Sequence, residues 1–328
     1  MDWKKSKALP GRAMRSLLFL LACQQPPVEE APEPEPERPP NFLIIDIDSL
    51  RADRIDNPPP GIASLKEKGV HFTHTITPSG WTLPSLAGML SGQHSPGELM
   101  EPLETPARTR TFPSILSAYG YHMGVAWGHT VLTEHPRSLS WLNPSKEVHD
   151  MVGIRGMAKS LAEGPEEPFL YLLHDTDLHV PLDTRSKPGP RQAQERYDRA
   201  LMLYDQELQN LLLALNDSGL AERTVVVLLT DHGEELYDHD ELGHGRMHWD
   251  TVIRTPMIIV DPELPGSSHG YIQKRPVSTL DLAPTLLERA GVEVHAEMEG
   301  ISLQKALRTE PLPDREFYTL TRHLAASL

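Results

Sequence analysis

Short apolar runs that alternate with amphipathic stretches constrain the fold of this chain more than any other feature. Five such runs lie at residues 41–48, 124–127, 169–174, 224–229 and 256–260. Runs of this kind are typical of strands buried on both faces of a parallel sheet. The stretches between and after them predict helices at residues 62–68, 84–91, 112–119, 192–215 and 280–290. The alternation predicts an α/β fold with a doubly wound, mostly parallel central sheet flanked by helices.

Three of the apolar runs end in Asp and His, residue types that bind metal ions. These residues are Asp46 and Asp48 after the first run, His174, Asp175, Asp177 and His179 after the third, and Asp231 and His232 after the fourth. The carboxyl ends of parallel strands meet at one edge of a sheet, where open α/β proteins form their sites. Any one of these residues alone is more often a turn cap or a hydrogen-bonded structural group. Their coincidence favours a divalent cation, because buried carboxylates without a counter-charge are costly.

A hydroxyl group precedes the helix expected at residues 84–91. Thr82 lies two residues before Pro84, and proline is favoured in the first turn of a helix. The exposed N–H groups at a helix N-terminus stabilise anions, so a hydroxyl placed there suits chemistry on a tetrahedral oxyanion. Taken alone, Thr82 or Ser85 is interpreted equally well as a simple helix cap.

The composition excludes several classes of function. The net charge of −15, from 31 Lys and Arg against 46 Asp and Glu, argues against nucleic acid as a partner, because phosphate backbones are bound by basic surfaces. The single Cys excludes an intramolecular disulfide framework and a thiolate metal cluster, so any metal ion must be held by His, Asp or Glu. No apolar run reaches the roughly 18 residues of a transmembrane helix.

The N-terminal residues predict a targeting segment. Basic residues between Lys4 and Arg15 precede a short apolar stretch that ends directly before Cys23, an arrangement that looks like a bacterial lipoprotein signal. The alternative is a buried Cys after a leader without lipid. We expect a signal peptide at 1–22, a lipidated Cys23, a Pro/Glu-rich tether at 23–40 and a catalytic domain at 41–328. Gln24 is not the Asp of a retention signal, so the expected location is the outer membrane of the cell envelope, facing the periplasm or the exterior.

Several segments resemble, in order, the site motifs of the sulfatase family, which belongs to the alkaline-phosphatase-like superfamily of metal-dependent hydrolases and transferases. They are 47–53 (IDSLRAD), 81–85 (WTLPS), 174–181 (HDTDLHVP), 230–235 (TDHGEE), 243–245 (GHG) with 253–256 (IRTP), and 277–291 (VSTLDLAPTLLERAG) with 299–303 (EGISL). The resemblance covers the chain from residue 41 to its end. It implies an alkaline-phosphatase-like fold, with the family's C-terminal subdomain short or missing after Tyr318.

The resemblance also implies roles for individual residues. It implies a divalent metal ion held by Asp48, Asp231 and His232, with Thr82 as a nucleophile that also touches the ion. It places His244 against the oxygens of the transferred group and His179 near the leaving group. Asp177 and Asp175 match the ligand pattern more loosely. It implies no role for Asp46, which we expect to be structural.

Two departures from the sulfatase pattern point toward phosphorus chemistry. Sulfatases need a Cys or Ser that is oxidised to formylglycine, whereas Thr82 would give a ketone, and Leu86 replaces the Arg of that pattern. A Thr nucleophile instead resembles that of the superfamily's phosphodiesterases and phosphoethanolamine transferases, which favours phosphodiesters over sulfate esters. Ser49 replaces a second carboxylate, so the mixed oxygen and nitrogen ligands favour Zn or Mn over Ca or Mg.

The residues leave three alternatives open. The first is a two-metal phosphodiesterase whose second ion is held by Asp175 and His179 together with His244 or His248. The second is a genuine sulfuric ester hydrolase. The third is a lipid-anchored pseudoenzyme that binds an envelope glycan, which Leu86 and the short C-terminus favour. The expected substrate is a phosphorylated or sulfated small molecule, lipid or glycan.

Overall fold

A computed structural model describes residues 38–94, 110–127, 149–179 and 187–320 of the chain. The predicted signal peptide, Cys23 and nearly all of the tether lie outside these residues. Among the described residues, no helix has both the length and the apolar character needed to cross a membrane.

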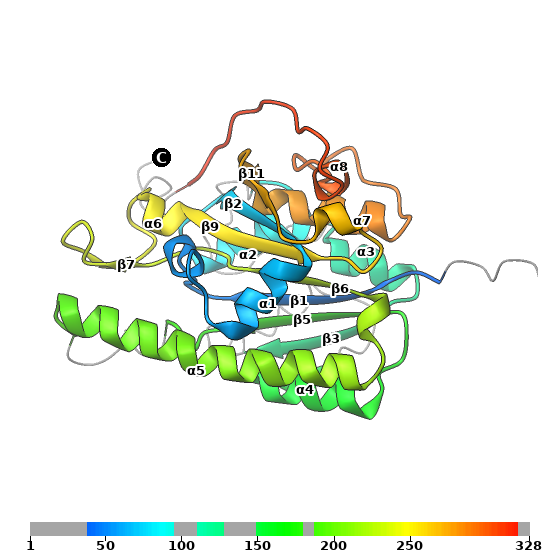
Figure 1. The fold of residues 1–328 in the computed structure, drawn as a ribbon. Coiled ribbons are helices and arrows are strands. Elements are labelled where there is room, and N and C mark those ends of the chain that lie inside the picture. The colour runs from blue at the N-terminus through cyan, green and yellow to red at the C-terminus, as the bar shows by residue number, and fades with distance from the viewer. Residues whose placement is uncertain (1–37, 95–109, 128–148, 180–186, 321–328) are drawn as a thin grey trace, which may run out of the picture. The chain divides into compact units, whose positions relative to one another are not determined.

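A mixed sheet forms the centre of the described part of the chain (Figure 1). Its strands run in the order β10-β2-β9-β6-β1-β5-β3-β4, with β11 paired to β2. Their bounds are β1 Asn41–Ile47, β2 Val70–Ile76, β3 His122–Trp127, β4 His149–Val152, β5 Phe169–Asp175, β6 Thr224–Leu229, β9 Arg254–Val260, β10 Tyr271–Gln273 and β11 Val277–Ser278. All of the pairings are parallel except those of β9 with β2 and β6. A separate hairpin pairs β7 (Glu235–Leu236) with β8 (Leu242–Gly243).

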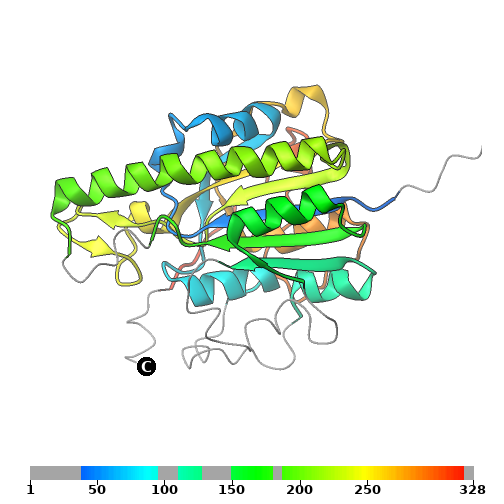
Figure 2. The ribbon, with the colours of Figure 1, turned by 90° about the horizontal axis from the view of Figure 1, so that it is seen from below.

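Helices cover both faces of this sheet, as Figures 1 and 2 show. One face carries α1 (Pro60–Lys68), α4 (Gly153–Glu163) and α5 (Pro190–Asp217), whose apolar side chains form one core cluster. The other face carries α2 (Thr82–Ser91), α3 (Phe112–Ala118) and α7 (Leu282–Arg289), which form a second cluster. The shorter helices are α6 (Asp250–Ile253), α8 (Gln304–Leu307) and the 3₁₀ turns η1 (Ala52–Ile55), η4 (Ala221–Arg223), η5 (Gly266–Ser268) and η6 (Thr279–Asp281).

The central strand β1 shows how the sequence builds two cores. Its side chains alternate between the faces, so Phe42 and Ile44 enter the cluster under α2, while Leu43 and Ile45 enter the cluster under α5. Every residue of β1 is buried, which explains why it reads as one continuous apolar run. The predicted α/β fold with a mostly parallel sheet is confirmed.

Some boundaries and elements differ from those that the sequence predicts. The helix expected to begin at Pro84 begins at Thr82, which puts Pro84 at its third residue, where no backbone N–H is needed for the helix ladder. The apolar pattern does not predict strand β2, because its sequence VHFTHTI mixes His and Thr with apolar residues and is only partly buried. Helix α4 is also absent from the predicted elements.

Candidate functional site

The site lies at the edge of the sheet where β1, β5 and β6 end side by side. The parallel register pairs Asp46 with His174 on one side and with Leu229 on the other. The residues that follow these positions, including Asp48 and Asp231, therefore emerge at the same level. This is the arrangement that the three polar strand ends predict.

Three of the predicted ligands form one buried group. Ligand atoms of Asp48, Asp231 and His232 all lie within 4.8 Å of one another. His232 Nε2 is 3.6 Å from Asp48 Oδ1 and 3.4 Å from Asp231 Oδ2. All three residues are buried, and Asp231 Oδ2 accepts no hydrogen bond from any described residue. A divalent cation would give this carboxylate oxygen the counter-charge that it lacks.

The tautomer of His232 also fits a metal ligand. Its Nδ1 is 2.9 Å from the carbonyl oxygen of Gly233, and because a carbonyl only accepts, Nδ1 carries the proton. The lone pair of Nε2 therefore faces Asp48 and Asp231. Holding the far nitrogen by a backbone carbonyl is how proteins orient imidazole ligands.

Without a cation, the neighbouring carboxylates of Asp48 and Asp231 repel each other. Burial raises the pKa of Asp231 well above its usual value, and the neighbouring carboxylates of Asp48 and Asp46 raise it further. Burial also acts to raise the pKa of Asp48, but the imidazoles of His232 and His174 outweigh it and the pKa is lowered. Two carboxylates this close compete for positive charge, which a divalent ion supplies to both.

Asp46 and His174 form a hydrogen-bonded pair next to Asp48. Asp46 Oδ2 accepts a hydrogen bond of 2.7 Å from His174 Nδ1, and His174 Nε2 lies 3.7 Å from Asp48 Oδ2. Burial alone would lower the pKa of His174, yet Asp46 raises it to about 9. Asp46 thus contacts His174 and lies outside the ligand group, and its structural role stays a prediction. Ser49 Oγ donates to Asp48 Oδ1 at 2.9 Å from the other side.

Thr82 lies at the N-terminus of α2, facing the ligand group. Its Oγ1 is 3.0 Å from His232 Nε2, to which the hydroxyl donates. No side chain caps this helix, so Thr82 is not the helix cap that the sequence allowed. Ser85 donates instead to the backbone carbonyl of Asp231 at 2.6 Å, which ties the helix to the metal-ligand loop. Leu86 packs in the apolar core beneath, at 1% exposure.

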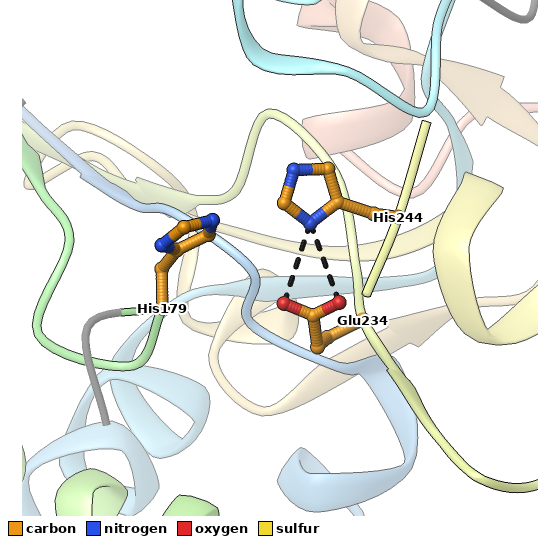
Figure 3. Close-up of side chains that lie close together, drawn as sticks. All are labelled: His179, Glu234 and His244. Atoms are coloured by element: carbon orange, nitrogen blue, oxygen red, sulfur yellow. Dashed lines mark hydrogen bonds and ion pairs between the residues drawn. The ribbon is translucent and has the colours of Figure 1, made fainter. Parts of the chain in front are cut away.

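A second group of potential ligands lies next to the first, as Figure 3 shows. Ligand atoms of His179, Glu234 and His244 lie within 4.8 Å of one another. His244 Nδ1 is 3.3 Å from each carboxylate oxygen of Glu234. The ring centroids of His244 and His232 are 4.1 Å apart, so the two ligand groups are adjacent. Glu234 is part of the TDHGEE motif, but the sequence assigned it no role.

The weaker sequence candidates do not join either group. Asp175 Oδ1 accepts a hydrogen bond from the backbone N–H of Asp177, and burial together with Asp177 raises the pKa of Asp175 to about 6. Asp177 and His248 are exposed. Among the described residues, the groups that can hold an ion contain none of these three. A second ion held by Asp175 stays a prediction of the two-metal alternative.

The loop that carries His232 and Glu234 has no room for a side chain at position 233. A Cβ at this position would lie 2.1 Å from the backbone oxygen of Thr251. The backbone N–H of Gly233 donates to Val252 at 2.7 Å, so the loop packs directly against α6. Glycine is required here for close approach of two backbones, and this approach fixes the directions of His232 and Glu234.

Comparisons with known proteins identify the family of the chain. Residues 40–292 match the model of the Sulfatase family. The chain is 22% identical to the ulvan-active sulfatase of Formosa agariphila, covering 90% of this chain and 70% of that protein. It is 26% identical to a low-salt glycan biosynthesis sulfotransferase of Haloferax volcanii, covering 80% of this chain and 64% of that protein. The phosphonate monoester hydrolase of Agrobacterium radiobacter shares the fold, with a TM-score of 0.68 at 17% identity, covering 84% of this chain and 78% of that one.

Proposed function

The chain belongs to the sulfatase family, and from this membership we propose that it is a metal-dependent enzyme that transfers phosphoryl groups from phosphoesters through Thr82. Phosphodiesters are the proposed substrates ahead of sulfate esters. Two of the relatives are an ulvan-active sulfatase and a glycan biosynthesis sulfotransferase, which supports a glycan as substrate or acceptor beside a lipid or a small molecule.

One observation carries this proposal. The hydroxyl of Thr82 faces His232 Nε2 from the first residue of a helix, where the nucleophile of a phosphoryl transfer is needed. Thr82 cannot become formylglycine, and Leu86 is buried in the core, where it places no charge beside the nucleophile. The phosphonate monoester hydrolase of the same fold supports phosphorus chemistry on this scaffold.

The residues of the chain have distinct tasks in this mechanism. Asp48, Asp231 and His232 would hold the ion, which when bound supplies Lewis-acid polarisation and a lower pKa for a nearby hydroxyl. Thr82 Oγ loses its proton to solvent water and attacks phosphorus, while the bond to the leaving oxygen breaks and His179 protonates that oxygen. His244 and the N–H groups of α2 face the remaining phosphoryl oxygens. Thr82 then carries the phosphoryl group together with its remaining ester. Attack by water in a hydrolase, or by a lipid or sugar hydroxyl in a transferase, breaks the bond from Thr82 Oγ to phosphorus and restores the Thr82 hydroxyl.

A panel of three aryl esters tests the proposal directly. We expect the full-length protein, loaded with Zn²⁺ or Mn²⁺, to cleave an aryl phosphodiester faster than an aryl phosphate monoester or an aryl sulfate. The measurement is the initial rate of phenol release at equal substrate concentration. An aryl sulfate cleaved faster than the phosphodiester would support the sulfuric ester hydrolase. Absence of turnover with all three esters would support the non-catalytic glycan-binding alternative.

We further propose that Cys23 is lipidated and anchors the protein in the outer membrane of a bacterial cell envelope. We expect Cys23→Ser to move the protein from the membrane fraction to the soluble fraction, because acyl chains provide the membrane affinity. Gln24→Asp serves as the control, since it keeps the Cys and should change only the membrane in which the protein is found. Mass spectrometry of the mature N-terminus provides the check, and an unmodified Cys23 there would refute the anchor.

A further inference from the structure

We propose that residues 310–320, here called the strap, position the nucleophile Thr82, and that His94 is the positioning residue that fastens the strap. The proposal rests on the proposed function, because it concerns the nucleophile of that reaction. Figure 1 shows the strap in red, running from α8 to the end of the described chain. Its residues form neither helix nor strand, apart from a β-bridge between Leu320 and Ser79.

The end of the strap contacts the loop that precedes Thr82. The backbone N–H of Leu320 donates to the carbonyl oxygen of Pro78 at 2.8 Å, and Ser79 Oγ donates to the carbonyl oxygen of Leu320 at 3.1 Å. Ser79 is buried and lies three residues before Thr82. Because the chain between them is this short, a displacement of Ser79 also displaces the nucleophile.

His94 holds the strap two residues before this contact. Its Nε2 lies 3.0 Å from the carbonyl oxygen of Tyr318, and its Nδ1 lies 2.7 Å from Glu299 Oε2. A carbonyl and an ionised carboxylate only accept hydrogen bonds, so both ring nitrogens carry a proton and His94 donates to each partner. Hydrogen bonds from a charged donor are about twice as strong as neutral ones.

The strap therefore contacts the chain on both sides of α2. This helix begins at Thr82, which follows the contact with Leu320, and it ends before His94. The carbonyl oxygen of Gly92, at the end of the helix, accepts from the backbone N–H of Glu299 at 2.8 Å, which fixes the carboxylate partner of His94. Contacts at both ends of a helix limit its movement along its axis, and this sets the position of the Thr82 hydroxyl.

Two ion pairs hold the strap nearer to α8. Arg315 Nη1 is 2.7 Å from Asp281 Oδ1, and the side chain of Asp281 is fully buried. Arg275 pairs with Asp314 at the surface. Both pairs are independent of His94. Loss of His94 should therefore release the end of the strap and leave the rest of it in place.

Polar contacts hold this end of the strap more than burial does. Tyr318 is 63% exposed and Leu320 is 39% exposed. Because little apolar surface is buried there, weaker polar contacts should shift the strap without unfolding the domain. A shifted nucleophile lowers kcat, since reaction depends on close alignment with phosphorus. KM should stay near its wild-type value, because the groups that bind the ester do not move.

Hydrogen–deuterium exchange of the full chain tests the strap without any turnover. We expect the backbone amides of residues 79–83 to exchange about tenfold faster in His94→Ala than in the wild type, at an unchanged Tm. His122→Ala is the matched control. His122 Nδ1 also lies beside a glutamate, 3.4 Å from Glu166 Oε2, but at the start of β3. Equal exchange at residues 79–83 in His94→Ala and the wild type would overturn the proposal.

Two closer replacements separate the contact with the strap from the contact with Glu299. A Gln side chain places an N–H near the position of Nε2, whereas Asn places one near the position of Nδ1. We expect kcat for an aryl phosphodiester to fall about tenfold in His94→Ala and His94→Asn at a constant KM, and His94→Gln to recover most of it. Equal losses in the Gln and Asn variants, or a raised KM at constant kcat, would contradict the positioning role.

The two measurements also separate this proposal from the proposed function. Faster exchange in His94→Ala, together with absent phosphodiester turnover in wild-type protein that holds its metal, would support the strap and overturn the proposed function. Phosphodiester turnover by the wild type, together with unchanged exchange and kcat in His94→Ala, would overturn the strap alone.

Discussion

Thr82→Ala is expected to lose phosphodiester turnover by roughly a thousand-fold or more, because the variant has no oxygen to form the covalent intermediate. The fold should remain that of the wild type, since Thr82 caps no helix and its hydroxyl forms a hydrogen bond only with His232 among the described residues. The measurement is kcat/KM for an aryl phosphodiester, together with acid quench and mass spectrometry of the peptide that contains Thr82.

Two further variants test whether the loss of turnover is due to the missing hydroxyl. Thr82→Ser keeps a hydroxyl within reach of His232, so it should retain part of the activity and form a phosphorylated peptide. Ser91→Ala removes a hydroxyl at the opposite end of α2 and should turn over at the wild-type rate. A wild-type rate in Thr82→Ala, or phosphate trapped on another residue, would contradict the mechanism.

Asp231→Asn is expected to abolish retention of the first metal ion and, with it, turnover. The variant removes one of two carboxylates that share the ion, and the remaining Asp48 and His232 are too few ligands for tight binding. Thermal unfolding should rank the stabilities of the wild type and Asp231→Asn differently with a chelator and with added metal. With a chelator, Asp231→Asn should be at least as stable as the wild type, because Asp231 Oδ2 is buried without a hydrogen-bond donor among the described residues.

Addition of metal should then stabilise the wild type alone. Free metal at about 100 times its dissociation constant adds about 2.7 kcal/mol, or several degrees in Tm for a domain of this size. Asp205→Asn is the control. Asp205 is another buried carboxylate, but it accepts from the backbone N–H groups of Gly61 and Ile62 at the start of α1. This variant should lose stability equally with and without metal, and an equal metal response in Asp231→Asn would remove Asp231 from the site.

The sequence was sufficient to predict the fold class and the main ligand group. The five apolar runs correspond to β1, β3, β5, β6 and β9, because continuous burial on both faces leaves an unmistakable pattern. The carboxyl ends of parallel strands lie at one edge of a sheet, so the sequence predicted polar strand ends at one edge, and the resemblance to the sulfatase family singled out Asp48, Asp231 and His232 among them. Whether they bind metal, and whether Thr82 is the nucleophile, stays a prediction until the experiments are done.

Other features depended on contacts between distant segments. Periodicity reports which faces of a strand are buried but not its neighbours, so the antiparallel direction of β9 could not be read from its apolar run. Strand β2 was missed because partial burial blurs its alternation. The position of Leu86 also depended on tertiary contacts, because the packing of α2 buries it in the core.

For the site residues too, the sequence determined some features and the tertiary structure determined others. Sequence alone determined that Asp and His residues follow three strand ends, because composition and spacing are local properties of the chain. Only the tertiary structure decided their directions, since a loop side chain turns according to the backbone that packs against it. The backbone of Thr251 packs against Gly233, Glu234 contacts His244, and Asp175 accepts a hydrogen bond from the N–H of Asp177. These contacts join residues whose positions relative to one another no local pattern encodes.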